Sequence, residues 1–153
     1  MKLYVTRHGE TDWNVQSKVM GKIDIALNEK GIKQAEATRD ALAGSKIDLI
    51  IASPLARALQ TAKIINEGIN AQIITDDRIS ERDFGEFEGL NRQEFDFKGF
   101  WSYAKSYQYQ TTENIEYFFQ RVYEFLDSLS LLDSDLNVLI VAHGGISIPI
   151  NCY

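Results

Sequence analysis

The sequence is poor in the residues that make disulfides and zinc sites, with one cysteine and two histidines in 153 residues. The single cysteine, Cys152, excludes an internal disulfide framework and is typical of a reducing cytoplasm. One cysteine and two histidines are also too few for a zinc site built from these two residue types. Carboxylate ligands for another metal remain available among the 22 aspartates and glutamates.

The sequence also lacks a surplus of basic residues and a long apolar run. Its formal net charge is −6 at pH 7, whereas nucleic-acid-binding proteins usually carry a basic face. No run of about 18 apolar residues is present, which argues against a membrane-spanning helix, and the N-terminus does not resemble a signal peptide. We expect residues 1–153 to form one cytoplasmic domain that binds neither nucleic acid nor membranes.

Short apolar runs alternate with helical patterns along the chain. The apolar runs predict strands at residues 2–6, 47–52, 71–75 and 138–142. Between them the pattern predicts helices at residues 28–43, 54–68 and 112–131. We expect Asn28, Ser53 and Thr112 to be the N-caps of these helices, with Pro54 at the first helical position of the second. This alternation is typical of an α/β fold with a mostly parallel sheet.

Three polar segments directly follow predicted strands: Arg7-His8-Gly9, Ser53 and His143-Gly144. Ligands of parallel α/β sheets bind beyond the carboxyl ends of the strands, so these segments are expected to share one edge. The guanidinium of Arg7 offers a planar set of donors beside a histidine, and Gly9 lets the backbone approach an anion closely. The pattern predicts that His8 is a nucleophile that attacks a phosphate.

The possible partners of His8 each have an ordinary structural interpretation. Arg57 lies on the first turn of a predicted helix, where it either strengthens an anion site or is simply solvated. A histidine such as His143 more often satisfies a structural role, although here both histidines follow strands and precede glycine. Sequence physics does not choose a catalytic acid among four neighbouring carboxylates: Glu81, Asp83, Glu86 and Glu88.

Five ordered segments that span nearly the whole chain resemble the histidine phosphatase superfamily, also called phosphoglycerate mutase-like. They are Thr6–Thr11 with Asn14; Gly21–Asp24 through Leu27, Gly31, Gln34 and Ala35; Ser53–Ala62; Glu81–Gly85 with Glu88-Gly89; and Ala142–Gly145. The resemblance implies a three-layer α/β/α fold with a mostly parallel central sheet and a helical, aromatic-rich lid inserted at about residues 84–111.

The resemblance also implies a covalent mechanism without metal or cofactor. His8 would carry the phosphoryl group of a small phosphorylated metabolite, and Glu81 would protonate the leaving oxygen. The other implied site residues bind the phosphoryl oxygens or the substrate: Arg7, Arg57 and His143, with Asn14, Gly21 and Gly144 as further candidates. A neutral imidazole is available near pH 7 because the unperturbed pKa of histidine is about 6.5.

The superfamily contains both phosphatases and mutases, so the reaction must be predicted from the positions at which this chain differs from the mutases. Residues 90–111 hold only Arg92, Lys98 and Lys105 as basic residues, with no basic pair for a second anionic group. Asp83-Phe84 also stands where the mutases carry histidine-tyrosine. Both departures favour a phosphatase. The alternatives are phosphoglycerate mutase-type transfer or a weakly active protein that binds a phosphate ligand.

Two further features are specific to this chain. Of its 17 aromatic residues, 13 lie between Phe84 and Tyr123. They either form the core of the lid or line a leaving-group pocket, for which the candidates are Phe95, Phe97, Trp101, Tyr103, Tyr107 and Tyr109. The chain also ends ten residues after His143, in the apolar segment 146–153. Since relatives usually continue, we expect an incomplete C-terminal end, an exposed edge beside His143 and a tendency to form homo-oligomers.

Overall fold

The fold was obtained as a computed structural model that describes residues 1–105 and 109–153, so Tyr107 lies outside the described residues. The strands are β1 (Lys2–Arg7), β2 (Leu49–Ala52), β3 (Gln72–Thr75) and β4 (Asn137–Ala142). The α-helices are α1 (Asp12–Val15), α2 (Glu29–Ala41), α3 (Ala56–Asn66), α4 (Ile115–Leu129) and α5 (Ser147–Cys152). Short 3-10 helices within the described residues are η1 (Asp77–Ile79), η2 (Gly85–Phe87) and η3 (Phe97–Trp101).

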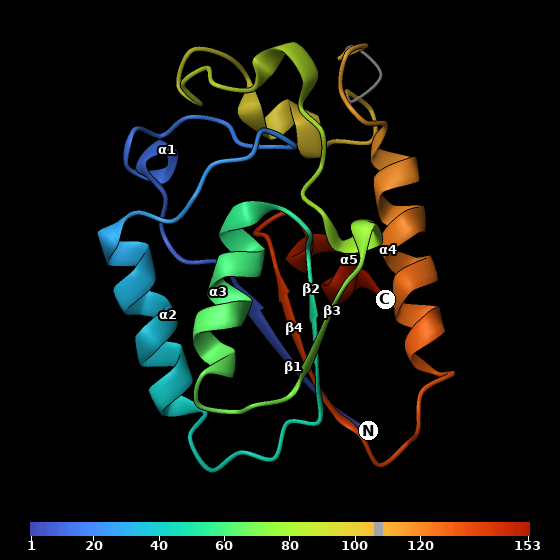
Figure 1. Ribbon diagram of the computed structural model, residues 1–153. Coiled ribbons are helices and arrows are strands. Elements are labelled where there is room, and N and C mark those ends of the chain that lie inside the picture. Colours follow the sequence, from blue (N-terminus) through green and yellow to red (C-terminus); the bar gives the residue numbers. More distant parts are fainter. Residues whose placement is uncertain (106–108) are drawn as a thin grey trace.

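The four strands form one parallel sheet in the order β1-β4-β2-β3. Helix α4 covers one face, and α2 and α3 lie on the other (Figure 1). Successive residues of β4 divide between the two layers: Ile140 packs with α4, whereas Leu139 and Val141 pack with α3. The central strands β2 and β4 are buried on both faces and therefore continuously apolar, which is why these two runs could be recognised. The predicted three-layer α/β/α fold with a parallel sheet is confirmed.

The predicted helix starts are correct for α2 and wrong for α3 and α4. Asn28 caps α2, since its side chain accepts a hydrogen bond from Gly31 N at 2.8 Å. Helix α3 begins at Ala56 instead of Pro54, because the Ser53 hydroxyl is hydrogen-bonded to His143 and does not cap the helix. Helix α4 is capped by Asn114, whereas the Thr112 hydroxyl donates to the Tyr109 carbonyl at 2.8 Å.

Residues 84–105, here called the lid segment, run over the carboxyl ends of the strands (Figure 1). Phe84 and Phe100 are buried there with Val19, and their partly buried neighbours are Phe87, Phe95, Phe97, Trp101 and Tyr109. The rings meet mostly edge to face, with centroids 5.4 Å apart for Phe84–Phe100 and 5.0 Å for Phe87–Phe100. The lid segment therefore has a small aromatic core of its own.

Candidate active site

The sheet brings the two histidines together because each directly follows one of two adjacent strands. His8 comes after β1 and His143 after β4, and these strands pair in parallel with Arg7 opposite Ala142. The His8 amide donates to Ala142 O at 3.0 Å, which continues the ladder past the strand. The two ring centroids are 5.2 Å apart. Both side chains are buried at the carboxyl edge of the sheet, where the sequence placed them.

The hydrogen bond of His8 identifies which of its ring nitrogens is free. His8 Nδ1 lies 2.7 Å from the Gly9 carbonyl oxygen. A carbonyl only accepts, so Nδ1 carries the proton and Nε2 keeps an unshared electron pair. Burial lowers the pKa of His8 to about 3, and the positive charges of Arg57 and Arg7 act in the same direction. His8 is therefore neutral near pH 7, as a nitrogen nucleophile requires.

His143 is held by the serine that was expected to cap α3. Its Nε2 lies 2.7 Å from Ser53 Oγ, and its Nδ1 is buried without a partner among the described residues. Ser53 Oγ also accepts a hydrogen bond from Leu55 N at 3.3 Å, and its own proton could be donated to His143 Nε2. Nδ1 would then be the protonated nitrogen, with a proton to donate. Burial holds the pKa of His143 well below its usual value, so this ring is neutral too.

Arg57 is completely buried, and part of its donor capacity is used to fix its position. Its two terminal nitrogens donate to Ile23 O at 2.9 Å and to Gly21 O at 2.8 Å, while Nε has no partner among the described residues. The structure thus places Gly21 against Arg57, where its carbonyl holds the guanidinium. The charge of Arg57 lowers the pKa values of His8 and His143. Arg57 therefore lies close enough to act on both rings.

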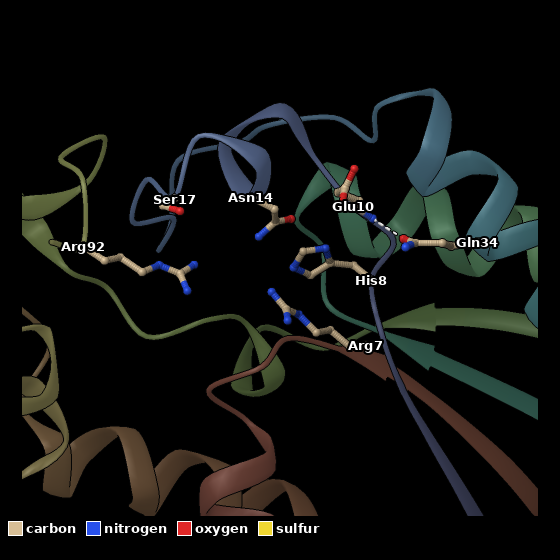
Figure 2. Close-up of a pocket in the computed structure, with 7 residues that line it drawn as sticks. All are labelled: Arg7, His8, Glu10, Asn14, Ser17, Gln34 and Arg92. Carbon is tan, nitrogen blue, oxygen red and sulfur yellow. Dashed lines mark hydrogen bonds between the residues drawn. The ribbon is translucent and has the colours of Figure 1, made fainter.

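A polar cavity of about 400 Å³ opens in front of His8 (Figure 2). Its lining residues are Arg7, His8, Glu10, Asn14, Ser17, Gln34 and Arg92. Asn14 Oδ1 accepts from Thr11 N at 3.0 Å as part of the capping box of α1, and its amide nitrogen points into the cavity. The Arg7 guanidinium makes no ion pair or hydrogen bond with the described residues. Arg7, Asn14 and Arg92 together direct nitrogen donors toward this space, as an anion would require.

Among the four competing carboxylates, only Glu81 is both buried and directed to the site. Its Oε1 accepts from Arg82 N at 2.9 Å and its Oε2 from Gly145 N at 3.0 Å. Burial raises the pKa of Glu81 despite these hydrogen bonds and the charges of Arg57 and Arg7. The other three carboxylates accept hydrogen bonds elsewhere. Asp83 accepts from Gly85 N and Glu86 from the Thr111 hydroxyl. Glu88 accepts from three backbone amides, those of Lys22, Ile23 and Phe84.

Two arginines fix the segment that carries Glu81. Arg121 pairs with Glu113 at 2.6 Å and donates to Glu81 O at 3.2 Å. Arg82 donates to Glu113 O at 2.8 Å and to the Phe100 carbonyl, with its guanidinium over the Trp101 ring. Arg121 belongs to α4, and the Phe100 carbonyl that binds Arg82 belongs to the lid segment, so the network connects Glu81 to both. The carboxyl group of Glu81 is thus held in place before any substrate binds.

A second cavity of about 200 Å³ lies beside Glu81 and shares Arg7 and Arg92 with the first. Its apolar walls come from Val19, Met20, Phe84, Phe97, Trp101 and Ile148, and Gly144 and Gly145 complete the lining. Of the aromatic candidates for a leaving-group pocket, Phe97 and Trp101 line this cavity. Phe95 and Tyr109 instead pack in the lid core, and Tyr103 is exposed.

Sequence reasoning missed Arg92, Gln34 and Ser17 as lining residues. Gln34 Oε1 accepts a hydrogen bond from Glu10 N at 2.8 Å, which secures the segment after His8. Arg92 was considered only as one of three scattered basic residues between 90 and 111. Its charge in an otherwise aromatic segment was the available signal, but no periodicity showed where it would point. In the described part of the chain, no three His, Cys, Asp or Glu side chains are grouped so that they could hold a metal.

Two neutral histidines and two arginines at the carboxyl edge of a parallel sheet define an α/β protein with an anion-binding, histidine-centred site. The chain belongs to the histidine phosphatase superfamily (branch 1), whose family model matches residues 3–152. None of the helices in residues 1–105 and 109–153 is long and apolar enough to cross a membrane.

Several proteins are similar to this chain over most of its length. The chain is 39% identical over 143 residues to the uncharacterized phosphatase PhoE of Bacillus subtilis, covering 92% of this chain and 70% of that protein. It is 32% identical over 149 residues to phosphoserine phosphatase 1 of Hydrogenobacter thermophilus, covering 94% and 71%. The solved structure of Bacillus stearothermophilus YhfR superposes with a TM-score of 0.88 at 34% identity, covering 98% of this chain and 77% of that one.

Proposed function

We propose that the protein is a cytoplasmic phosphatase that hydrolyses small phosphomonoesters through a phosphohistidine on His8, without metal or cofactor. The observation that carries the proposal is the protonation state of the site. Nδ1 of His8 is fixed as a donor, the pKa of the ring is lowered to about 3, and the pKa of Glu81 is raised. A free nucleophile therefore lies beside a carboxyl group whose pKa is shifted upward, toward the protonated form that a general acid needs.

In the first step, the electron pair on His8 Nε2 forms the bond to phosphorus while the bond from phosphorus to the leaving oxygen breaks. The proton of Glu81 passes to that oxygen, so the leaving group departs as a neutral alcohol. Arg7, Arg57, His143 and Asn14 would stabilise the negative charge on the equatorial oxygens, because preorganised donors act strongly in a water-poor site. The Gly144 amide is a further candidate for this role.

In the second step, a water molecule attacks the phosphorus of phospho-His8. Glu81, now ionised, accepts one proton of that water, and the bond from phosphorus to Nε2 breaks. The electron pair returns to Nε2, Glu81 is protonated again and inorganic phosphate leaves. The same carboxyl thus serves as acid and then as base, and no other group is needed to balance the protons.

The basic residues after Glu81 support hydrolysis over a mutase reaction. Lys98 is exposed, and Lys105 pairs with Asp96 at 3.1 Å. Neither lines the two cavities at His8 and Glu81, and only Arg92 of the three basic residues does. A mutase must hold a substrate with two anionic groups in both orientations, and residues 90–111 bring a single cation, Arg92, to these two cavities.

The deciding experiment measures release of phosphate from an aryl phosphate and from 3-phosphoglycerate in EDTA. The wild type should turn over, His8→Ala should not, and Lys98→Gln is the control at an exposed residue. With a bisphosphorylated primer, 3-phosphoglycerate should give free phosphate and no 2-phosphoglycerate. Turnover by His8→Ala, or a requirement for added metal, would refute the mechanism. Appreciable 2-phosphoglycerate would assign a mutase instead.

A further inference from the structure

Arg92 is a charged residue of the lid segment that the proposed mechanism leaves without a role. Its backbone is fixed against the segment after α1: Arg92 N donates to Ser17 O at 3.0 Å, beside the antiparallel bridge between Lys18 and Asn91. From there the side chain extends toward His8 and Arg7 (Figure 2). The Phe97 ring lies 5.2 Å from its guanidinium carbon, which supports the side chain from the lid.

The charge of Arg92 has no counter-ion in the described part of the molecule. Its guanidinium makes no ion pair and no hydrogen bond with any described residue, and its Nε is buried without a partner. Burial and the charge of Arg7 lower the pKa of Arg92, and the one carboxylate that opposes them is Glu81, the group proposed to be protonated. A half-buried cation without a partner is costly, so this arrangement is expected where a ligand supplies the missing charge.

The phosphoryl pocket has a matching need for donors. A phosphoryl dianion brings two negative charges, yet both histidines are neutral and Arg57 spends two nitrogens on the carbonyls of Gly21 and Ile23. Arg7 approaches from the sheet, whereas Arg92 reaches the same cavity from the opposite side, as Figure 2 shows. Arg92 therefore lines the side of this cavity that lies opposite Arg7, where it could meet oxygens of a bound phosphoryl group.

We propose that Arg92 is a third phosphoryl-binding arginine, supplied by the lid segment, that contacts the transferring group itself. The proposal deepens the phosphatase function and rests on it. Arg92 would neutralise charge on the phosphoryl oxygens, and the Phe97 ring would act as a positioning residue for its guanidinium. Recognition of the phosphoryl group would in this way depend on the packing of the aromatic lid core.

Binding of inorganic phosphate tests the contact without turnover. Calorimetric titration with phosphate should show that Arg92→Gln weakens binding about 10- to 100-fold, the effect typical of losing a charge-assisted hydrogen bond. Lys98→Gln makes the same charge change on an exposed part of the lid segment and should stay within about twofold. Arg92→Lys keeps the charge but not the planar fork and should fall between them. Urea unfolding of each variant shows whether it is folded.

Turnover separates a role at the phosphoryl group from a role at the leaving group. Arg92→Gln should lower kcat/KM by the same factor for phenyl phosphate and for 4-carboxyphenyl phosphate, and added guanidinium should restore part of its activity but none of the activity of His8→Ala. A loss confined to the carboxylated substrate, equal losses in Arg92→Gln and Lys98→Gln, or unchanged phosphate binding would each overturn the proposal. Arg92-dependent phosphate binding without His8-dependent turnover would instead refute the phosphatase mechanism alone.

Discussion

The role of Glu81 can be tested by the identity of the leaving group. An acid matters in proportion to how poorly the leaving oxygen carries negative charge, so Glu81→Gln should discriminate between two substrates. Glycerol 3-phosphate releases an alkoxide unless it is protonated, whereas p-nitrophenyl phosphate releases a stabilised anion. General acid catalysis contributes about 10²- to 10⁴-fold. We therefore expect a loss of that size in the phosphorylation step for glycerol 3-phosphate and a loss below about tenfold for p-nitrophenyl phosphate.

The second step gives the same variant a kinetic signature. Without Glu81 as a base for water, phospho-His8 should accumulate when p-nitrophenyl phosphate is the substrate. Rapid-quench measurements of Glu81→Gln should then show a burst of nitrophenol close to one equivalent of enzyme, followed by slow turnover. Glu86→Gln is the matched control, because Glu86 lies in the same segment but accepts a hydrogen bond from Thr111 instead of facing the site. Equal losses on both substrates without a burst would refute the assignment of Glu81.

The stability of the variant can be predicted from the two backbone amides that Glu81 accepts. Glutamine can accept from only one of Arg82 N and Gly145 N, because its amide nitrogen must face the other. One buried N–H left unsatisfied costs about 1–3 kcal/mol of unfolding free energy. The raised pKa of Glu81 also means that the folded state binds more protons than the unfolded state. Its contribution to stability is thus present at acidic pH and is lost as pH rises through the folded pKa, and Glu81→Gln removes it.

Three further predictions concern residues around the site and in the core. Because the pKa of His8 falls from 6.5 to about 3, the wild type should lose up to about 1.4 kcal/mol of unfolding free energy per unit as pH drops below about 6.5, and His8→Gln should reduce this slope in urea titrations. In Gly145→Ala the new methyl group would lie 2.1 Å from Glu81 Oε1 and 2.8 Å from the Trp101 ring; kcat for glycerol 3-phosphate should fall at least about tenfold, and an unchanged kcat would contradict the placement of Glu81. Phe118→Ala empties a fully buried position between α4 and the sheet; urea unfolding should show a loss of about 3–5 kcal/mol, and a loss below about 1 kcal/mol would argue against this packing.

The central strands β2 and β4 could be predicted from the sequence because they are buried on both faces, and the outer strands β1 and β3 were recognised as short apolar runs although they are partly exposed. Helix boundaries, in contrast, depended on contacts with distant residues. Ser53-Pro54 is a common opening for a helix, yet the Ser53 hydroxyl is taken by His143, 90 residues later in the chain. Helix α5 was not predicted, and it contains Pro149 as its third residue. Proline is tolerated there since an N–H in the first turn of a helix has no partner within the helix.

The candidate site was predictable where strand ends fixed the position of a residue, as for Arg7, His8 and His143. The choice of Glu81 came from the family resemblance alone, because the four carboxylates differ in burial and in the direction of their side chains, and both properties are set by tertiary packing. Arg92 was missed for a similar reason. Its position in the cavity follows from the hydrogen bond that its backbone amide donates to Ser17 O. This contact joins two distant segments of the chain and cannot be predicted from a local sequence pattern.

One physical cause produces both protonation states that the mechanism needs. Burial disfavours the charged form of any group, so it lowers the pKa of His8 and raises the pKa of Glu81. The negative charge of a bound phosphoryl dianion raises the pKa of both groups. For Glu81 this acts in the same direction as burial, but for His8 it acts against burial and favours the protonated, unreactive imidazolium. Cations that neutralise the dianion, Arg7 and Arg57 and in our proposal Arg92, counter that effect. The arginines would thus keep the nucleophile unprotonated in the complex while they stabilise the transferring group.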